Sequence, residues 1–182
     1  MSLDEFLRPV ARARWLWALF GTACLAAGIV ALAGGLDLAT FSTLFGVFLL
    51  VAGFFDVVAG LDGDPSRRVF AVVLAVVALI GGLVCLRRPD LVAVVLVAGV
   101  YLVVAGALHL ASGFHAARPH AEWALGGVYA VLGCLVLALP ALRVGTLAPL
   151  VGVAIVARGA VALDAVLHTR ATAPRRMQPT RG

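Results

Sequence analysis

The sequence has little charge and no lysine. Only 13% of its 182 residues are charged, 63% are hydrophobic, and all 14 basic residues are arginine. A soluble domain has about a quarter charged residues and about half apolar ones. A chain so poor in charge cannot cover its apolar surface against water. The composition therefore excludes a soluble globular protein and predicts that the lipid bilayer surrounds the chain.

The sequence also lacks the patterns that carry most enzyme chemistry. The three cysteines, Cys24, Cys85 and Cys134, lie in apolar runs without CxxC spacing. They support neither a disulfide framework nor a zinc site, and we expect them to be small packing residues. No nucleophile–base arrangement, paired-carboxylate motif or phosphate-binding glycine loop is present. We therefore expect no enzyme activity, no catalytic residue, no cofactor and no metal ion.

Long apolar runs fill most of the chain instead. They are rich in Leu, Ala and Val, and they lack the alternation of apolar and polar residues that is typical of a membrane barrel. Each run is long enough for a helix to cross the hydrocarbon core, which takes about 20 residues. We therefore predict an all-α membrane protein with six transmembrane helices within residues 15–167. The predicted spans are 15–34, 40–61, 69–86, 91–113, 121–139 and 146–167.

Two segments lie outside the predicted transmembrane domain. Residues 1–14 combine a capping pattern, Ser2 with Glu5, and a stripe of apolar residues at helical spacing. They predict a short cytoplasmic segment at the membrane interface. Residues 168–182 are polar, basic and proline-bearing, which predicts a disordered cytoplasmic tail.

Arginine is unequally divided between the two sides of the predicted bundle. Ten arginines flank the side that carries both termini, three flank the other side, and Arg158 lies within a span. By the positive-inside rule, both termini lie in the cytoplasm. We therefore expect a multi-pass protein of the bacterial inner (plasma) membrane whose terminal arginines contact anionic lipid headgroups. No basic face belongs to a soluble domain, so no nucleic-acid partner is expected.

Glycines seven residues apart recur along the chain at a constant step of 53 residues. They are Gly46, Gly53, Gly60, Gly99, Gly106, Gly113, Gly152 and Gly159. A fixed step indicates an internal repeat, with units at about 15–67, 68–120 and 121–167. Each unit contains two spans, so successive units enter the membrane in the same orientation. The sequence thus predicts three parallel two-helix repeats related by a pseudo-threefold axis along the membrane normal.

The glycine spacing predicts a smooth groove along one helix face. Seven residues turn an α-helix through about 700°, so each glycine lies about 20° from the previous one. In lipid, such a groove lets another helix pack closely against the backbone. The alternative is a lining of small residues around a pore. The sequence also leaves open whether the grooves close within one chain or between copies in a homo-oligomer.

Four ionisable residues lie within the apolar spans: Asp56, His109, Arg158 and Asp164. Charge at membrane depth is costly and indicates function. Asp56 and His109 are one repeat apart, and helical geometry puts Arg158 on the same side, whereas Asp164 points elsewhere. The first three can form a buried polar cluster suited to a proton relay or a pH-sensing contact. Alternatively, Asp56 and His109 lie near the headgroups, about one turn from the cytoplasmic span ends, and Arg158 snorkels to water.

Three segments of the repeat carry a resemblance to a known family. They are LFGVFLLVAGFFDVVAG (44–60), VAGVYLVVAGALHLASGF (97–114) and LGGVYAVLGCLVLALP (125–140). They resemble the HdeD-type family of short-repeat, six-span bacterial membrane proteins associated with acid resistance. The resemblance rests on glycine and proline spacing over about 15–168, and it brings no catalytic residue. The first unit departs from the pattern by having Gly34 where the third has Pro140.

Two functions remain open at the level of sequence. The resemblance implies a non-enzymatic protein of acid resistance or envelope stress, acting through membrane interactions. The alternative is a small channel or transporter for protons, ions or a small solute, with the polar cluster on its path. A conducting protein needs a continuous polar path, yet the outer halves of the spans supply few polar residues beyond Thr40, Ser42, Thr43 and Thr146. This scarcity favours the interaction protein.

Overall fold

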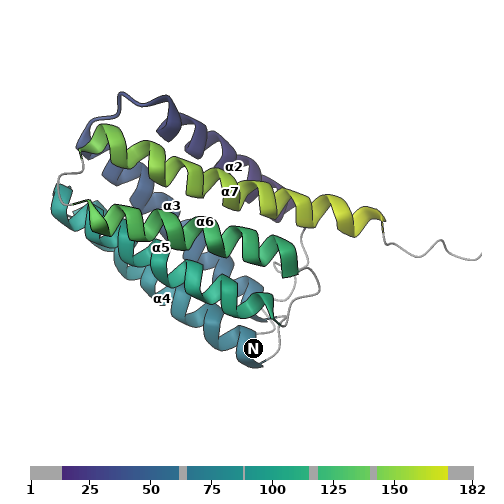
Figure 1. Cartoon of the computed structure of the whole chain (residues 1–182). Helices are drawn as coiled ribbons and strands as arrows, with labels where there is room; N and C mark the ends of the chain where they lie inside the picture. The colour runs from purple at the N-terminus through teal and green to yellow at the C-terminus, as the bar shows by residue number, and fades with distance from the viewer. Residues whose placement is uncertain (1–13, 62–64, 88, 115–118, 140–142, 172–182) are drawn as a thin grey trace, which may run out of the picture.

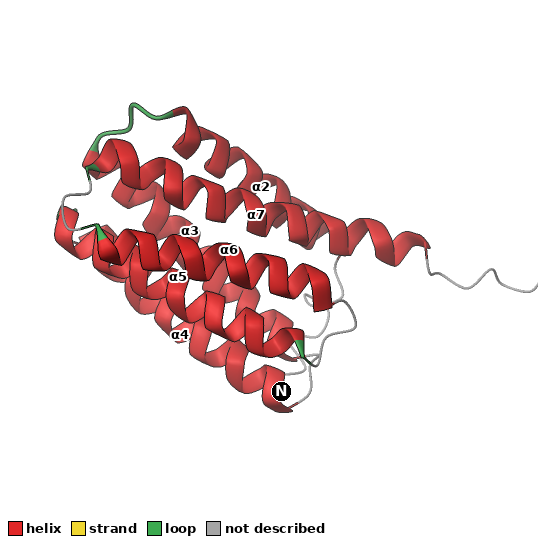
Figure 2. Ribbon diagram, in the orientation of Figure 1, coloured by secondary structure: helices red, strands yellow, loops and turns green. Residues whose placement is uncertain are grey.

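The computed structural model describes residues 14–61, 65–87, 89–114, 119–139 and 143–171. These residues form six helices and no strand (Figure 2). All six helices are long and apolar enough to cross a membrane, so the predicted all-α membrane fold is confirmed. The helices are α2 (Arg14–Ala33), α3 (Leu38–Leu61), α4 (Pro65–Arg87), α5 (Leu91–Gly113), α6 (Pro119–Ala138) and α7 (Val144–Ala171).

Short polar signals set several helix ends. Two glycines with positive φ angles, Gly34 at 73° and Gly35 at 77°, follow α2, a conformation that glycine adopts without steric cost. Asp37 precedes α3 and accepts a hydrogen bond from the backbone N–H of Thr40 at 3.3 Å. Asp90 precedes α5 and accepts one from the N–H of Ala93 at 3.1 Å. Both aspartates therefore satisfy amide groups that a helix leaves unpaired at its N-terminus.

The C-terminal helix is longer than the sequence predicted. α7 continues to Ala171, so the first four residues of the predicted disordered tail, 168–171, are helical. Their sequence, His-Thr-Arg-Ala, contains no helix breaker, and the first proline of the tail is Pro174. The rest of that tail lies outside the described residues. So does the predicted interfacial segment 1–14, apart from Arg14, which begins α2.

The helices run side by side along one axis, and successive helices are antiparallel (Figure 1). We call the end where α2 begins and α7 ends the terminal end. The opposite end, where residues 34–37 connect α2 to α3, is the loop end. α3 and α5 therefore finish at the terminal end, and α4 and α6 begin there.

The closest helix pairs are α3 with α4, α5 with α6, and α2 with α7. The last pair closes the bundle into a ring within one chain. α4 meets α5, and α6 meets α7, less closely, and α2 meets α3 least. Each close pair therefore joins the second helix of one sequence unit to the first helix of the next unit around the ring. The two helices of a single unit pack less closely on each other. The reason is that the glycine-bearing helices, α3, α5 and α7, direct their glycines toward the next unit around the ring.

Backbone atoms approach one another where these glycines lie. A β-carbon on Gly106 of α5 would stand 2.5 Å from the backbone nitrogen of Ala130 on α6. A β-carbon on Gly46 of α3 would stand 3.0 Å from the carbonyl oxygen of Gly82 on α4. On α7, one on Gly159 would stand 2.8 Å from the carbonyl oxygen of Gly21. Such close contact supplies much of the van der Waals energy that holds helices together in lipid.

The core of the loop-end half is apolar. Among the described residues, its buried polar side chain is Ser42, whose hydroxyl donates a hydrogen bond to the carbonyl oxygen of Cys85 at 2.7 Å. Large apolar side chains, each under 2% exposed, fill this half. They are Phe41, Phe45, Leu49, Val94, Leu147 and Val151.

Candidate functional site

The terminal-end half of the core contains a buried ion pair. Arg158 of α7 donates a hydrogen bond to Oδ1 of Asp56 on α3, and each residue is 8% exposed. A lone charge in the hydrocarbon region is costly, and pairing with an opposite charge offsets much of that cost. The pair joins helices of the first and third sequence units. The guanidinium of Arg158 thus lies inside the bundle against Asp56 and does not extend to its surface.

Aromatic side chains surround the ion pair. The guanidinium carbon of Arg158 lies 5.8 Å from the ring centroid of Phe20 on α2, within the range of a cation–π interaction. Phe20 in turn stacks on Phe55, with ring centroids 4.3 Å apart. Tyr101 of α5 and Tyr129 of α6 are fully buried and lie close enough to interact electrostatically with both charges. Residues of five helices thus meet around Asp56 and Arg158.

Several polar atoms of this cluster make no hydrogen bond within the described residues. They are Asp56 Oδ2, Arg158 Nε, His109 Nε2 and the hydroxyl oxygens of Tyr101 and Tyr129. Buried polar groups in native proteins nearly always have a partner, which is often water. The cluster therefore has donor and acceptor capacity beyond its internal contacts.

A second polar contact lies between α5 and α6. The Nδ1 atom of His109 is 2.8 Å from Oε2 of Glu122, and the hydroxyl of Ser112 donates to the same carboxylate oxygen at 3.3 Å. The imidazole ring also meets the ring of Tyr129 edge-on, with centroids 5.9 Å apart. The side chains of His109 and Glu122 are 19% and 27% exposed. Both side chains are therefore only partly buried.

A pocket of about 160 Å³ connects the two polar contacts. Its polar lining comes from Asp56, His109, Ser112 and Glu122, and α4 supplies an apolar wall. The pocket lies at the terminal end, because Ser112 is near the end of α5 and Glu122 is near the start of α6. It is large enough to hold several water molecules. The structure therefore brings Asp56 together with Arg158, and places His109 in the same pocket as Asp56, with Glu122 as its direct partner.

The sequence alone did not single out Glu122, Tyr101 or Tyr129. Glu122 is the fourth residue of α6, where an acidic side chain is ordinarily explained by the helix dipole. The available signal was that it falls inside the predicted span 121–139, where a carboxylate is costly. The signal for the tyrosines was their hydroxyl group in an otherwise apolar run, since a buried tyrosine usually needs a polar neighbour. Asp164, the fourth predicted ionisable residue, is half-buried on α7 and does not line the pocket.

The cluster combines two carboxylates, a guanidinium, an imidazole and two phenols. The carboxylates and the imidazole can gain and lose protons, whereas the guanidinium supplies a fixed positive charge. The pocket at the terminal end is lined by both carboxylates and the imidazole. The apolar core of the loop-end half begins beyond them. The arrangement therefore suits a proton-sensitive site with one open side.

Comparison with known proteins identifies the repeat. The model of a family described as a short repeat of unknown function (DUF308) matches residues 34–87 and 73–137. The first match contains α3 and α4, and the second contains α5 and α6 with the latter part of α4. Searches of curated proteins and of solved structures found no match. Because the two family matches together cover more than half of the 182 residues, this chain belongs to the DUF308 short-repeat family.

Proposed function

We propose that this chain is a non-enzymatic protein of the bacterial inner membrane that responds to acidification in acid resistance or envelope stress. The observation that carries the proposal is the polar cluster itself, which is buried among the candidate membrane spans and lies beside a pocket at the terminal end. The resemblance of the repeats to HdeD-type proteins supports the same role. In the proposed topology both termini, and therefore the pocket, face the cytoplasm, where the terminal arginines meet anionic headgroups.

The contact between His109 and Glu122 supplies the pH response in this proposal. Histidine is the side chain whose charge ordinarily changes between pH 5 and 8. The groups that face the imidazole are Glu122 and Tyr129 on α6 and Asp56 on α3. When the imidazole gains a proton, its hydrogen bond to the Glu122 carboxylate becomes an ion pair, which is stronger. Acid in the cytoplasm would thereby tighten the contact between α5 and α6.

A small channel or transporter for protons, ions or a small solute is the second candidate. The pocket favours it, because it reaches inward from the terminal end as far as the carboxyl group of Asp56. Conduction would require a second opening through the large apolar side chains of the loop-end half. The closed apolar core supports the non-conducting role over this alternative.

Survival of acid-challenged bacteria tests the proposal. Cells that produce the wild-type chain, His109→Gln or His120→Gln would be exposed to a permeant weak acid, which lowers cytoplasmic pH, with equal membrane abundance checked by immunoblot. His120 is exposed beside Trp123 at the terminal end and does not line the pocket, so it is the matched control. We expect protection by the wild type and by His120→Gln, and loss of protection in His109→Gln. Equal protection by all three, or none by the wild type, would contradict the proposal.

A further inference from the structure

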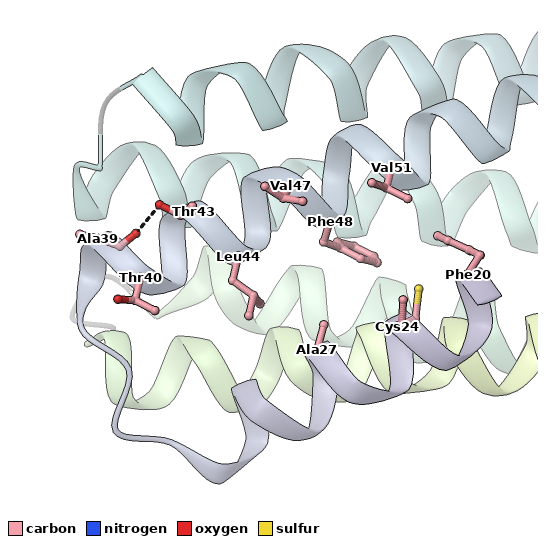
Figure 3. A pocket seen from close by; sticks show the side chains of 11 residues that line it. Phe20, Cys24, Ala27, Ala39, Thr40, Thr43, Leu44, Val47, Phe48 and Val51 are labelled. Atoms are coloured by element: carbon pink, nitrogen blue, oxygen red, sulfur yellow. Dashed lines mark hydrogen bonds between the residues drawn. The ribbon is translucent and has the colours of Figure 1, made fainter.

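We infer that the groove between α2 and α3 binds one acyl chain of a membrane lipid. The groove has a volume of about 630 Å³, with α2 as one wall and α3 as the other (Figure 3). Ala23, Cys24 and Ala27 line it from α2, and Val47 and Phe48 line it from α3. Both helices are membrane spans, so the medium outside the groove is lipid.

The groove exists because α2 packs toward α7. α2 directs Gly21 and Gly28 at α7, where β-carbons on them would come within 3.1 Å of α7 backbone atoms. The small residues Ala23 and Ala27 of α2 face α3 instead. The equivalent contacts in the other two units, α4 with α5 and α6 with α7, are closer. One of the three repeated interfaces is therefore left open.

The side chains that line the groove favour an apolar ligand. The polar members of the lining are Thr40 and Thr43 at the loop end, together with the Cys24 thiol. The hydroxyl of Thr43 already donates to the carbonyl oxygen of Ala39 at 2.8 Å. No charged side chain lines the groove. A hydrocarbon chain gains close packing there and leaves no polar group unsatisfied, whereas a polar solute would lose its hydration without compensation.

The dimensions suit a thin chain better than a whole helix of a second copy. The α3 residues that line the groove run from Ala39 to Val51, about 18 Å along the axis at 1.5 Å per residue. A volume of about 630 Å³ over that length gives a mean cross-section of about 35 Å². A helix about 11 Å across has a cross-section of about 95 Å². The groove thus accommodates a thin, flexible chain.

The groove also has a direction. α2 and α3 diverge toward the loop end, and Phe20 and Val51 lie at the opposite end of the groove (Figure 3). The acyl chain therefore enters from the leaflet at the loop end, and its methyl end lies near Phe20 and Cys24. Phe20 is the ring that packs against the guanidinium of Arg158, so the chain would end beside the aromatic wall of the polar cluster.

Photolabelling in vesicles tests this inference. The purified full chain would be reconstituted in phosphatidylethanolamine–phosphatidylglycerol vesicles doped with a phosphatidylethanolamine that carries a diazirine in one acyl chain, and adducts would be mapped by mass spectrometry. We expect adducts concentrated on residues 20–27 and 39–51. In Ala27→Phe, which fills the groove, labelling there should fall to the level of other lipid-facing segments. Ala26→Phe, at an exposed position outside the groove, should label as the wild type does.

Val47→Phe narrows the groove from the α3 side and repeats the test if Ala27→Phe does not fold. Native mass spectrometry adds a second readout, namely one phospholipid retained on the wild type and on Ala26→Phe but not on the groove-filling variants. Adducts spread evenly over all lipid-facing helices, or undiminished in both groove-filling variants, would overturn the inference. Adducts that join two protein chains through the groove would show a second copy there and would overturn it as well.

Discussion

At the scale of single residues, Asp56 and Arg158 depend on one another. Each is 8% exposed within a membrane-spanning core, where a charge without a partner has neither water nor an opposite charge to stabilise it. Removing one member of a buried pair costs about 3–5 kcal/mol, whereas replacing both often costs little. Substitution of either residue alone is therefore destabilising. The ion pair as a whole contributes little to the free energy of unfolding.

We accordingly expect Asp56→Asn and Arg158→Gln each to lower the free energy of unfolding by about 3–5 kcal/mol. The double variant should recover most of that loss, because it buries no unpaired charge. Unfolding in mixed micelles as the fraction of denaturing detergent rises measures all three. Single variants as stable as the wild type, or a double variant that loses the sum of both, would rule out a mutually dependent pair.

The contact between His109 and Glu122 should strengthen in acid. A double-mutant cycle with His109→Gln and Glu122→Gln isolates its coupling energy. Hydrogen bonds between membrane helices average about 0.6 kcal/mol, and those to charged groups are worth about 1.5–3 kcal/mol. We therefore expect the coupling energy to be larger at pH 5.5 than at pH 8, because a protonated imidazole makes an ion pair with the carboxylate. A coupling energy that does not change with pH would remove the proposed pH response.

Asp37 predicts a second, smaller pH effect outside the spans. Hydrogen bonds from the side chain and backbone of Thr40 lower the pKa of Asp37 below its ordinary value. Folding thus favours the carboxylate, so the stabilisation is complete above the ordinary pKa and disappears as the pH falls through the lower folded value. Asp37→Asn keeps the cap but cannot ionise. We expect the variant to be slightly less stable than the wild type at pH 6, and the difference measured by thermal unfolding to shrink as the pH falls below the ordinary aspartate pKa.

At the scale of helices, the glycines set the distance between the two helices of each close pair. Gly106 and Gly127 lie on α5 and α6 and differ sharply in surroundings. A β-carbon on Gly106 meets the backbone of Ala130 at 2.5 Å, and one on Gly127 meets nothing within 4 Å. Backbone atoms cannot rotate away as a side chain can, so the two helices themselves would have to separate.

We therefore expect Gly106→Ala to lower the free energy of unfolding by about 1–3 kcal/mol, the usual cost of overpacking. Gly127→Ala should be neutral or stabilising by up to about 1 kcal/mol, because alanine has the higher helix propensity. The same detergent titration compares them. Equal losses in the two variants would mean that glycine content, and not the close approach of α5 and α6, governs stability.

The helices were predictable because each is a long apolar run bounded by residues that end helices. Their ends lie within a few residues of the predicted spans. The largest differences are equal and lie at Pro65, against a predicted start at 69, and at Ala171, where no breaker follows residue 167 until Pro174. The pairing of helices was harder to predict. A stripe such as Gly99–Gly106–Gly113 shows which face of α5 packs closely, but periodicity does not say whether that face turns toward α4 or α6.

The polar cluster was predictable only in part for the same reason. Repeat register and helical angle place Asp56 and Arg158 on compatible faces, and the structure pairs them. They do not give axial height or the neighbouring helix, so the partner of His109, Glu122 on α6, was not evident. A single charged residue near the end of a span can lie in several environments of similar free energy, and the sequence alone does not distinguish among them.

At the scale of the whole molecule, the chain is a ring of three repeats with two unlike ends. The core of the terminal-end half contains the buried ion pair and the polar pocket, whereas the core of the loop-end half is filled by residues such as Phe41, Phe45 and Leu49. On the function proposed above, protons reach the polar cluster from the terminal end and the apolar half stops them. A conductor would instead need a polar path through that apolar half.

Proton flux in proteoliposomes tests that central claim most directly. Vesicles that contain the wild type, Asp56→Asn or no protein would be given a pH gradient, and internal pH would be followed with a trapped dye at external pH 7.5 and 5.5. We predict that the wild type and the variant pass protons no faster than empty vesicles at either pH. Flux above that of empty vesicles that disappears in Asp56→Asn would contradict the account and make the protein a conductor with Asp56 on its path.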